Sequence, residues 1–449
     1  MSSAAVRTEA PAEQTSAALR RSRVLIVAFY FPPAGGGGVQ RPLKFATHLP
    51  AHGFETHVLA PDDPKWIDRD EGLALPEQVR VHRAHFLGPR GRRPAEELYG
   101  LHGMRRAARK GRLLGRRLLV PDENVTWAPT AIRAARRIVR DEGIDVILTT
   151  SPPGSVHLVG ATVKAMTGIQ WVADLRDPLV AHPHRRVESP LVRVKQLGPS
   201  RVEDLVARHA DAVITASEAI SDELRHRLAL PRVDTIASGA DFDDFDGLEY
   251  RRGDRFRITH AGSFFGQRDP RPFLRALELV DGVTARFVGD SRAADREWAD
   301  ASPVADRVEW LSFASRARSL ELQRDSEALL LLIPEAGGRG NGILSGKVFE
   351  YLAAGRPVVA LVPPDGAAAR LLRQTGAGIV VAPDDVEGAA RALELLRDRW
   401  RGGDDLEVLL SPEQHDALSR ASRVGELAAL LRSLPRPEIP SQPIDDSGG

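Results

Sequence analysis

The chain has 449 residues, of which 42% are hydrophobic and 27% are charged, and its 62 basic and 61 acidic residues leave a formal net charge of +1. This length suggests two or three domains, and the balanced charge argues against a general nucleic-acid-binding protein. The chain contains no cysteine, which excludes disulfides, cysteine-ligated zinc and thiol catalysis and is compatible with a reducing cytoplasm.

Both ends of the chain have the composition of disordered tails. Residues 1–20 lack the apolar core of a signal peptide, and residues 435–449 are rich in Pro, Ser and Asp. No apolar run approaches the ~20 residues that span a bilayer. We therefore expect a cytoplasmic protein that is soluble, or at most peripheral to the inner face of a membrane.

Short β-rich apolar runs alternate with helical stretches along the chain. Runs such as VLIVAF and ALLLLI show no polar alternation, which is typical of strands covered on both faces of a parallel sheet. The alternation predicts an α/β fold with two Rossmann-like, doubly wound domains, at residues 21–238 and 255–434, joined by the polar linker 239–254. Ligands of such sheets bind at the carboxyl ends of the strands, so we expect the site in a cleft between two facing sheets. The predicted strands are residues 24–29, 56–60, 79–81, 146–149, 170–173, 212–215, 233–237, 256–261, 284–288, 308–311, 329–333, 358–362 and 378–381.

The first predicted strand runs into FYFPPAGGGGVQRPL, where four consecutive glycines precede a helix that begins near Val39. Glycine lets the backbone approach a ligand closely, and the helix N-terminus would face the cleft. The loop is not a P-loop, because no GK[ST] follows, and it is not a dinucleotide GxGxxG. A flexible loop is the alternative to a ligand site that contains Gly36, Gly37 and Gly38.

One segment of the first half is strongly basic. Between Arg90 and Arg117 the chain carries ten Lys or Arg residues and two Glu. A solvated, Arg-rich face is one interpretation. The other is a patch attracted to anionic lipid headgroups, where each charge near the surface contributes ~1 kcal/mol, with nearby leucines as an apolar edge.

A second polar group follows the predicted strand at residues 170–173. In WVADLRDP, the carboxylates of Asp174 and Asp177 flank Arg176. Two carboxylates and an arginine at the carboxyl end of a buried strand suit a functional role, and a local salt bridge is the alternative. His157 lies within a predicted helix and is expected to be structural.

The second half of the chain contributes two further loops at strand ends. In THAGSFFGQRDP, a loop with Gly262 ends at Arg268 before a helix, and in NGILSGKVFEYLAAGRPVVALV a helix start lies beside Lys347, with Glu350 one turn further on. Unpaired N–H groups, the helix dipole and an ammonium suit an anionic ligand, and a carboxylate beside a phosphate site often binds sugar hydroxyls. Surface ion pairs at ordinary helix starts are the alternative.

These motifs, in this order, resemble the GT-B glycosyltransferases, specifically the large family-4 group of retaining, nucleotide-sugar-dependent enzymes. The similarity extends over about residues 24–434 and rests above all on SGKVFEYLAAGRPVVAL. It implies a donor site in the C-terminal domain, an acceptor site in the N-terminal domain, and no required metal or other cofactor. It also implies that the final helices, at about residues 412–434, cross back to the N-terminal domain.

The resemblance assigns roles by position. Glu350 would bind the ribose of the donor, while Arg268 and Lys347 would hold its diphosphate. Arg176 and Asp177, the candidate catalytic residues, fall where many relatives have a histidine near the reacting sugar. Residues 342–344 would present backbone N–H groups to the sugar or the phosphates. The implied donor-binding residues are Gly262, Arg268, Gly342, Ile343, Leu344, Lys347 and Glu350.

Two positions depart from the family pattern. Gly342 stands eight residues before Glu350, where relatives have a first glutamate that contacts the donor sugar. Ser263 stands directly after Gly262, where relatives often have an arginine.

The implied activity is transfer of a hexose from a UDP- or GDP-sugar to a hydroxyl acceptor such as a glycan, a lipid-linked precursor or a small molecule, with retention. A GT-B-shaped nucleotide-sugar epimerase and a non-catalytic nucleotide-sugar-binding protein remain the alternatives.

Overall fold

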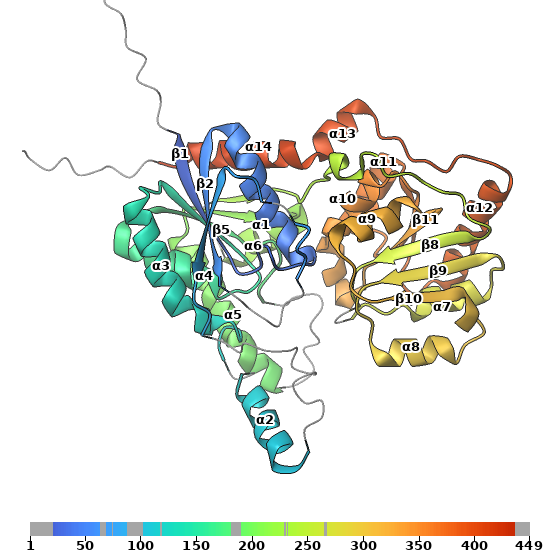
Figure 1. The fold of residues 1–449 in the computed structure, drawn as a ribbon, viewed down its shortest axis with the longest axis horizontal. Coiled ribbons are helices and arrows are strands. Elements are labelled where there is room, and N and C mark those ends of the chain that lie inside the picture. The colour runs from blue at the N-terminus through green and yellow to red at the C-terminus, as the bar shows by residue number, and fades with distance from the viewer. Residues whose placement is uncertain are drawn as a thin grey trace, which may run out of the picture.

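The computed structural model describes residues 21–62, 69–73, 75–87, 102–116, 119–180, 190–228, 230, 232–264 and 267–435. Within this part of the chain, two parallel β-sheets lie side by side, each covered by helices (Figure 1). This is the two-domain, doubly wound α/β fold that the sequence predicts. The predicted tails lie outside the described residues, apart from Pro435.

The N-terminal sheet has the strand order β3-β2-β1-β4-β5-β6-β7, and the C-terminal sheet has the order β10-β9-β8-β11-β12-β13. All pairings are parallel, as expected from the near-continuous apolar runs. Each of these strands overlaps one of the predicted runs. Their bounds are β1 Ser22–Ala28, β2 Phe54–Pro61, β3 Val79–Ala84, β4 Val146–Thr150, β5 Gln170–Asp174, β6 Ala212–Thr215, β7 Val233–Thr235, β8 Phe256–Ala261, β9 Val283–Val288, β10 Val308–Leu311, β11 Ala328–Leu332, β12 Val358–Leu361 and β13 Gly378–Val381.

Helices cover both faces of each sheet. Along β1, Val24 and Ile26 pack on the face covered by α1 and α14, while Leu25 and Val27 pack on the opposite face, toward α3 and α4. The helices are α1 Gly37–His48, α2 Gly103–Arg116, α3 Ala128–Asp141, α4 Val156–Thr167, α5 Pro190–His209, α6 Glu218–Leu228, α7 Arg271–Glu278, α8 Ala293–Asp300, α9 Arg316–Arg324, α10 Gly346–Ala353, α11 Ala367–Thr375, α12 Val386–Arg401, α13 Pro412–Leu418 and α14 Arg420–Ser433.

The strand order places a switch point in each sheet. In the N-terminal sheet the chain leaves β1 toward β2 on one side and β4 on the other, and in the C-terminal sheet β8 occupies the same position between β9 and β11. Loops diverge at such points and leave a crevice outside the carboxyl ends of the strands. The glycine-rich loop after β1 and the loop with Gly262 after β8 therefore lie at the two crevices.

Two connections join the domains. The linker contains the 3₁₀ helix η4 (Phe242–Phe245), and the chain returns through α13 to α14, which packs on the N-terminal domain (Figure 1). Val424, Leu427 and Ala428 of α14 are fully buried against the first sheet. A backbone bridge between Ala240 and Ser419 ties the linker to the start of this helix.

The basic segment is described only in part. Its residues 90–101 and 117 lie outside the described residues, whereas α2 extends away from the body of the N-terminal domain (Figure 1). In the described part of the chain, none of the helices has both the length and the apolar composition needed to cross a bilayer.

Candidate functional site

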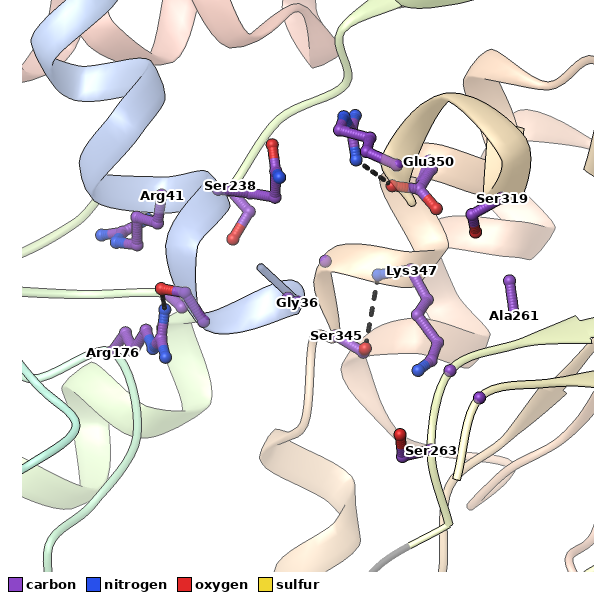
Figure 2. A pocket seen from close by; sticks show the side chains of 18 of the residues that line it. Gly36, Arg41, Arg176, Ser238, Ala261, Ser263, Ser319, Ser345, Lys347 and Glu350 are labelled. Carbon is purple, nitrogen blue, oxygen red and sulfur yellow. Dashed lines mark hydrogen bonds and ion pairs between the residues drawn. The ribbon is translucent and has the colours of Figure 1, made fainter. Parts of the chain in front are cut away.

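A cleft of about 500 Å³ lies between the carboxyl ends of the two sheets. The N-terminal side comes from the loops after β1 and β5 and from the start of α1, and the C-terminal side from the loops after β8, β9 and β11 with α9 and α10 (Figure 2). The predicted site residues that line the cleft are Gly36, Gly37, Gly38, Arg176, Asp177, Gly262, Arg268, Ile343, Leu344, Lys347 and Glu350. Segments more than 300 residues apart thus meet in one site.

The N-terminus of α10 opens into this cleft. Ser345 is its N-cap, and the Ser345 hydroxyl accepts a hydrogen bond from the Lys347 N–H at 3.3 Å. The N–H of Ile343 donates to the Gly340 carbonyl at 3.1 Å. It is therefore not directed at a ligand, contrary to what the family resemblance implies. The apolar face of α10 packs against β11 and β12, which fixes the positive end of the helix dipole at the cleft.

Lys347 lies directly over Gly262. A Cβ at Gly262 would stand 1.8 Å from Lys347 Nζ, so any side chain there would displace the ammonium, and the φ angle of +129° is one that favours glycine. Burial and the nearby charge of Arg268 lower the pKa of Lys347 to about 7, against a smaller opposing effect of Glu350. The ammonium is thus desolvated beside another cation, an environment that an anionic ligand would relieve.

Arg268 faces the same region and is held by a second loop. Only 6% of the residue is exposed, and burial lowers the pKa of its guanidinium. Its backbone carbonyl accepts from Arg292 Nη2 at 2.7 Å, and Arg292 Nε donates to the fully buried Asp295 at 2.6 Å. The backbone N–H of Phe264 donates to the Asp290 carbonyl at 2.7 Å. The loop after β8 and the loop after β9 therefore position Arg268 together.

Glu350 has partners on both carboxylate oxygens. Oε2 accepts from Arg316 Nη1 at 2.7 Å, and Oε1 accepts from Gln323 Nε2 at 2.5 Å. Both partners belong to α9, and their contacts fix the plane of the carboxylate. The remaining lone pairs can accept hydrogen bonds from ligand hydroxyls.

Gly342 is not brought to the cleft. Its carbonyl accepts from Ser217 Oγ at 2.7 Å, and a Cβ at this position would lie 3.5 Å from the Cβ of Ala219. The 3₁₀ helix η6 (Ala336–Gly342) therefore ends against α6 of the N-terminal domain. The residue at the position of the family's first glutamate forms a contact between the domains, and the sequence carries no local signal for this.

The N-terminal side of the cleft combines the glycine loop with the end of β5. Gly36 is the N-cap of α1 with a φ of +89°, and Arg176 Nη1 donates to the Gly38 carbonyl at 3.2 Å. Asp177 Oδ2 is 4.0 Å from Arg176 Nε. Burial is the main cause that lowers the pKa of Arg176, so this guanidinium, like Lys347, is poorly solvated.

Two other polar residues of this region belong to the scaffold. Asp174 is fully buried and accepts two hydrogen bonds from Arg41, at 2.8 and 2.9 Å. His157 is also fully buried, its Nδ1 is 2.8 Å from Thr149 Oγ1, and burial lowers its pKa to about 4. Asp174 thus anchors α1 to the sheet, and His157 is structural as predicted.

Several cleft residues were not predicted from the sequence. Arg41 follows the glycine loop by one helical turn, a spacing that could have identified it. The others carry no local signal, because each enters the cleft from a distant segment. They include Asp70, Ser238, Arg316, Ser319 and Arg420.

Within the described residues, no group of three or more His, Asp or Glu side chains is arranged to hold a metal ion.

Two protein-family models match the chain. One, described as Glycosyltransferase Family 4, matches residues 35–244, and the other, described as Glycosyl transferases group 1, matches residues 255–398. A comparison with curated protein sequences gives no match.

Solved structures with this fold include enzymes that act on sugars. HepE (Alr3699) of Anabaena, in complex with UDP-glucose, has a TM-score of 0.59 and 16% identity over 92% of this chain and 100% of its own. A trehalose-phosphate synthase of Burkholderia xenovorans, in complex with glucose-6-phosphate, has a TM-score of 0.59 and 14% identity over 92% and 100%. The lipopolysaccharide galactosyltransferase WaaB has a TM-score of 0.54 and 11% identity over 91% and 99%.

Two facing doubly wound domains with a ligand cleft between them define the GT-B fold, and the structural likeness extends over nearly the whole chain. The two family matches together cover most of the chain, one on each domain. The chain therefore belongs to the GT-B glycosyltransferases of the family-4 type, and it is an enzyme of that class.

Proposed function

We propose that this enzyme transfers a hexose from a UDP- or GDP-sugar to a hydroxyl acceptor, with retention of anomeric configuration. The observation that carries the proposal is the placement of Lys347 and Arg268 beside the N-terminus of α10, with Glu350 one turn further along the helix. Two neighbouring cations, a buried Arg268 and a partly buried Lys347, suit a diphosphate together with the helix N-terminus, and the carboxylate suits ribose hydroxyls. The family matches and the complex of HepE with UDP-glucose support a nucleotide-sugar donor.

The proposed reaction breaks the bond between the sugar's anomeric carbon and the diphosphate oxygen. A new bond forms between that carbon and the acceptor oxygen, and the acceptor proton passes to the departing diphosphate. Lys347, Arg268 and the α10 N-terminus would stabilise the charge that develops on the leaving group. Because these groups are already held in place by the scaffold, little reorganisation is needed as the bond breaks.

Arg176 and Asp177 are the proposed catalytic residues on the opposite side of the cleft. The contact of Arg176 with the Gly38 carbonyl fixes its guanidinium near the glycine loop, where it would meet the sugar or the acceptor. Asp177 is the more exposed of the two, with 44% of its side chain accessible, and would bind acceptor hydroxyls. Arg176→Lys should lower kcat more than it changes the affinity for UDP; an unchanged kcat would remove Arg176 from the mechanism.

We propose that the reaction needs no metal ion, because fixed cations would supply the charge that a metal supplies in other transferases. Activity should survive EDTA. Loss of activity on chelation that Mg²⁺ or Mn²⁺ restores would contradict this proposal.

Turnover distinguishes the candidate functions. A panel of UDP- and GDP-sugars should yield nucleoside diphosphate only when a hydroxyl acceptor is present, and NMR of the product should show the donor's anomeric configuration. Epimerised donor without acceptor would instead indicate an epimerase, and tight binding without turnover would indicate a binding protein.

Glu350→Ala should weaken UDP binding without unfolding the protein, and unchanged affinity would refute the ribose assignment.

The acceptor proposal includes a lipid-linked precursor at an anionic membrane. In α2, which extends away from the domain, Arg105 and Lys110 are exposed and Met104 is 90% exposed, as expected of a helix that rests on a charged interface. Co-sedimentation with phosphatidylglycerol vesicles should be strong at low salt and lost at high salt, and weaker for an Arg105→Glu/Lys110→Glu variant. Binding that is absent at low salt would favour the solvated-face interpretation.

A further inference from the structure

A chain of four alternating charges connects the N-terminal domain to the predicted ribose carboxylate. Lys44 Nζ of α1 lies 3.1 Å from Asp244 Oδ1 of the linker helix η4. Asp244 Oδ2 accepts from Arg316 Nη2 at 2.6 Å and from Arg316 Nε at 3.2 Å. Arg316 Nη1 then donates to Glu350 Oε2 at 2.7 Å, a contact drawn as a dashed line in Figure 2. We refer to these four residues as the interdomain ion chain.

The backbone of Arg316 forms a second link between the domains. Its N–H, the first of α9, donates at 2.7 Å to Oδ2 of Asp70, which belongs to the N-terminal domain and is only 5% exposed. Asp241 lies beside the ion chain, 3.2 Å from Lys44 Nζ and 4.0 Å from Arg316 Nη2, and Arg420 of α14 is bound to it at 2.7 Å. The position of Arg316 thus depends on both domains and on the linker.

The ion chain is sufficiently shielded for its charges to interact. The side chains of Lys44, Asp244, Arg316 and Glu350 are 16%, 24%, 17% and 22% exposed, so solvent screens them less than it screens surface pairs. Glu350 and Asp244 are the main charges that raise the pKa of Arg316, against the effect of burial. Arg316 is therefore shared between two carboxylates, and only one of these, Glu350, lines the cleft.

We infer that Asp244 and Lys44 are positioning residues for nucleotide binding, acting through Arg316 on the Glu350 carboxylate. Asp244 occupies two of the guanidinium's donor groups, and these contacts leave Nη1 directed at Glu350. Without them the guanidinium can rotate away, and Glu350 loses the partner that fixes one of its oxygens. Nucleotide affinity then depends on contacts made outside the cleft and partly in the other domain. This inference rests on the proposed function, because it assumes that Glu350 binds the nucleotide.

Calorimetry with UDP and with GDP tests the inference. Asp244→Asn should weaken binding of the nucleotide that the wild-type protein binds by roughly fivefold or more, within the range of coupling energies between sites. Lys44→Met, which alters the far end of the ion chain, should produce a smaller loss in the same direction. Asp243→Asn is the matched control, because Asp243 is the exposed neighbour on the same 3₁₀ helix and should leave affinity within twofold. Thermal melts of each variant separate loss of fold from loss of binding.

A double-mutant cycle supplies the readout that a purely structural role would not change. In a Glu350→Gln background, Asp244→Asn should cost little further affinity, because the carboxylate that it positions is already gone. Asp244→Glu should restore part of the loss. Equal losses in both backgrounds, or a loss no greater than that of Asp243→Asn, would overturn the inference.

Failure of the proposed function gives a different pattern. If neither nucleotide binds the wild-type protein, or if Glu350→Gln leaves the affinity unchanged, the ribose assignment itself is refuted. If Glu350→Gln weakens binding while Asp244→Asn does not, only the positioning role fails.

Discussion

The protonation of Lys347 should control nucleotide affinity. Because its pKa is about 7, Lys347 is largely the neutral amine above neutral pH, and binding of an anionic diphosphate raises that pKa. Binding at higher pH therefore requires Lys347 to take up a proton. Above about pH 7.5 the phosphates of UDP are fully ionised, so they do not contribute to the pH dependence. Affinity should then fall by up to tenfold per pH unit, or about 1.4 kcal/mol. Between pH 7.5 and 9.0 the expected loss is up to about thirtyfold, or about 2 kcal/mol.

Calorimetry with UDP across this range, in buffers of different ionisation enthalpy, measures both the affinity and the proton uptake. Lys347→Met should bind UDP more weakly, and its affinity should lack the pH dependence that Lys347 causes. Any pH dependence that remains in this variant, for example from ionisation of the uracil base, can then be subtracted from that of the wild-type protein. Lys347→Arg should bind without the slope, because the guanidinium stays charged. A wild-type affinity that is constant from pH 7.5 to 9.0, or the same slope in Lys347→Met, would refute the reasoning.

Three other substitutions test the site and its scaffold. Gly262→Ala should abolish UDP binding with only a modest fall in melting temperature, because its Cβ would lie 1.8 Å from Lys347 Nζ; normal affinity by calorimetry would contradict this. Arg292→Ala should weaken UDP binding by about 1–2 kcal/mol, because it releases the Arg268 carbonyl, and full affinity would show that the loop keeps its position unaided. Acid should destabilise the fold through His157, whose pKa is lowered to about 4. This histidine is neutral when folded and takes up a proton on unfolding, so its contribution is complete above about pH 6.5 and falls by up to about 3 kcal/mol as pH drops to 4. Urea titrations at pH 7, 5.5 and 4.5 measure that loss, which His157→Gln should reduce; an identical pH dependence in the variant would contradict it.

The fold was predictable because buried parallel strands have a characteristic composition. A strand such as β11, buried along its whole length, has no solvent face and therefore appears as an uninterrupted apolar run. Glycine loops and helix starts at the ends of such strands are equally local. Lys347, Arg268 and Glu350 were accessible from the sequence for this reason, since each lies within a few residues of a strand end or a helix start.

The remaining part of the site depends on contacts between distant segments. Arg41 and Asp174 are 133 residues apart, and neither residue's surroundings indicate the other. Asp174 was therefore grouped with Arg176 and Asp177, although it is a buried anchor of α1. Gly342 is separated by 125 residues from Ser217, to which it is bound. Arg316 has no motif of its own, and its importance comes from Asp244 and Glu350, which lie on different elements.

The partners of the basic side chains separate scaffold from ligand site. Arg41, Arg316 and Arg420 line the cleft, yet each is within 3 Å of a carboxylate oxygen, so their charges are already balanced. In the described part of the chain, no carboxylate lies within ion-pair distance of Lys347, and its pKa is lowered rather than raised. A cation held in a desolvated position without a carboxylate lowers stability unless an anion arrives to balance it. A helix N-terminus beside it provides a second attraction for the same anion. The arrangement at Lys347 is therefore costly for the empty enzyme and favourable for one that binds a diphosphate, which is the strongest physical reason to place the nucleotide there.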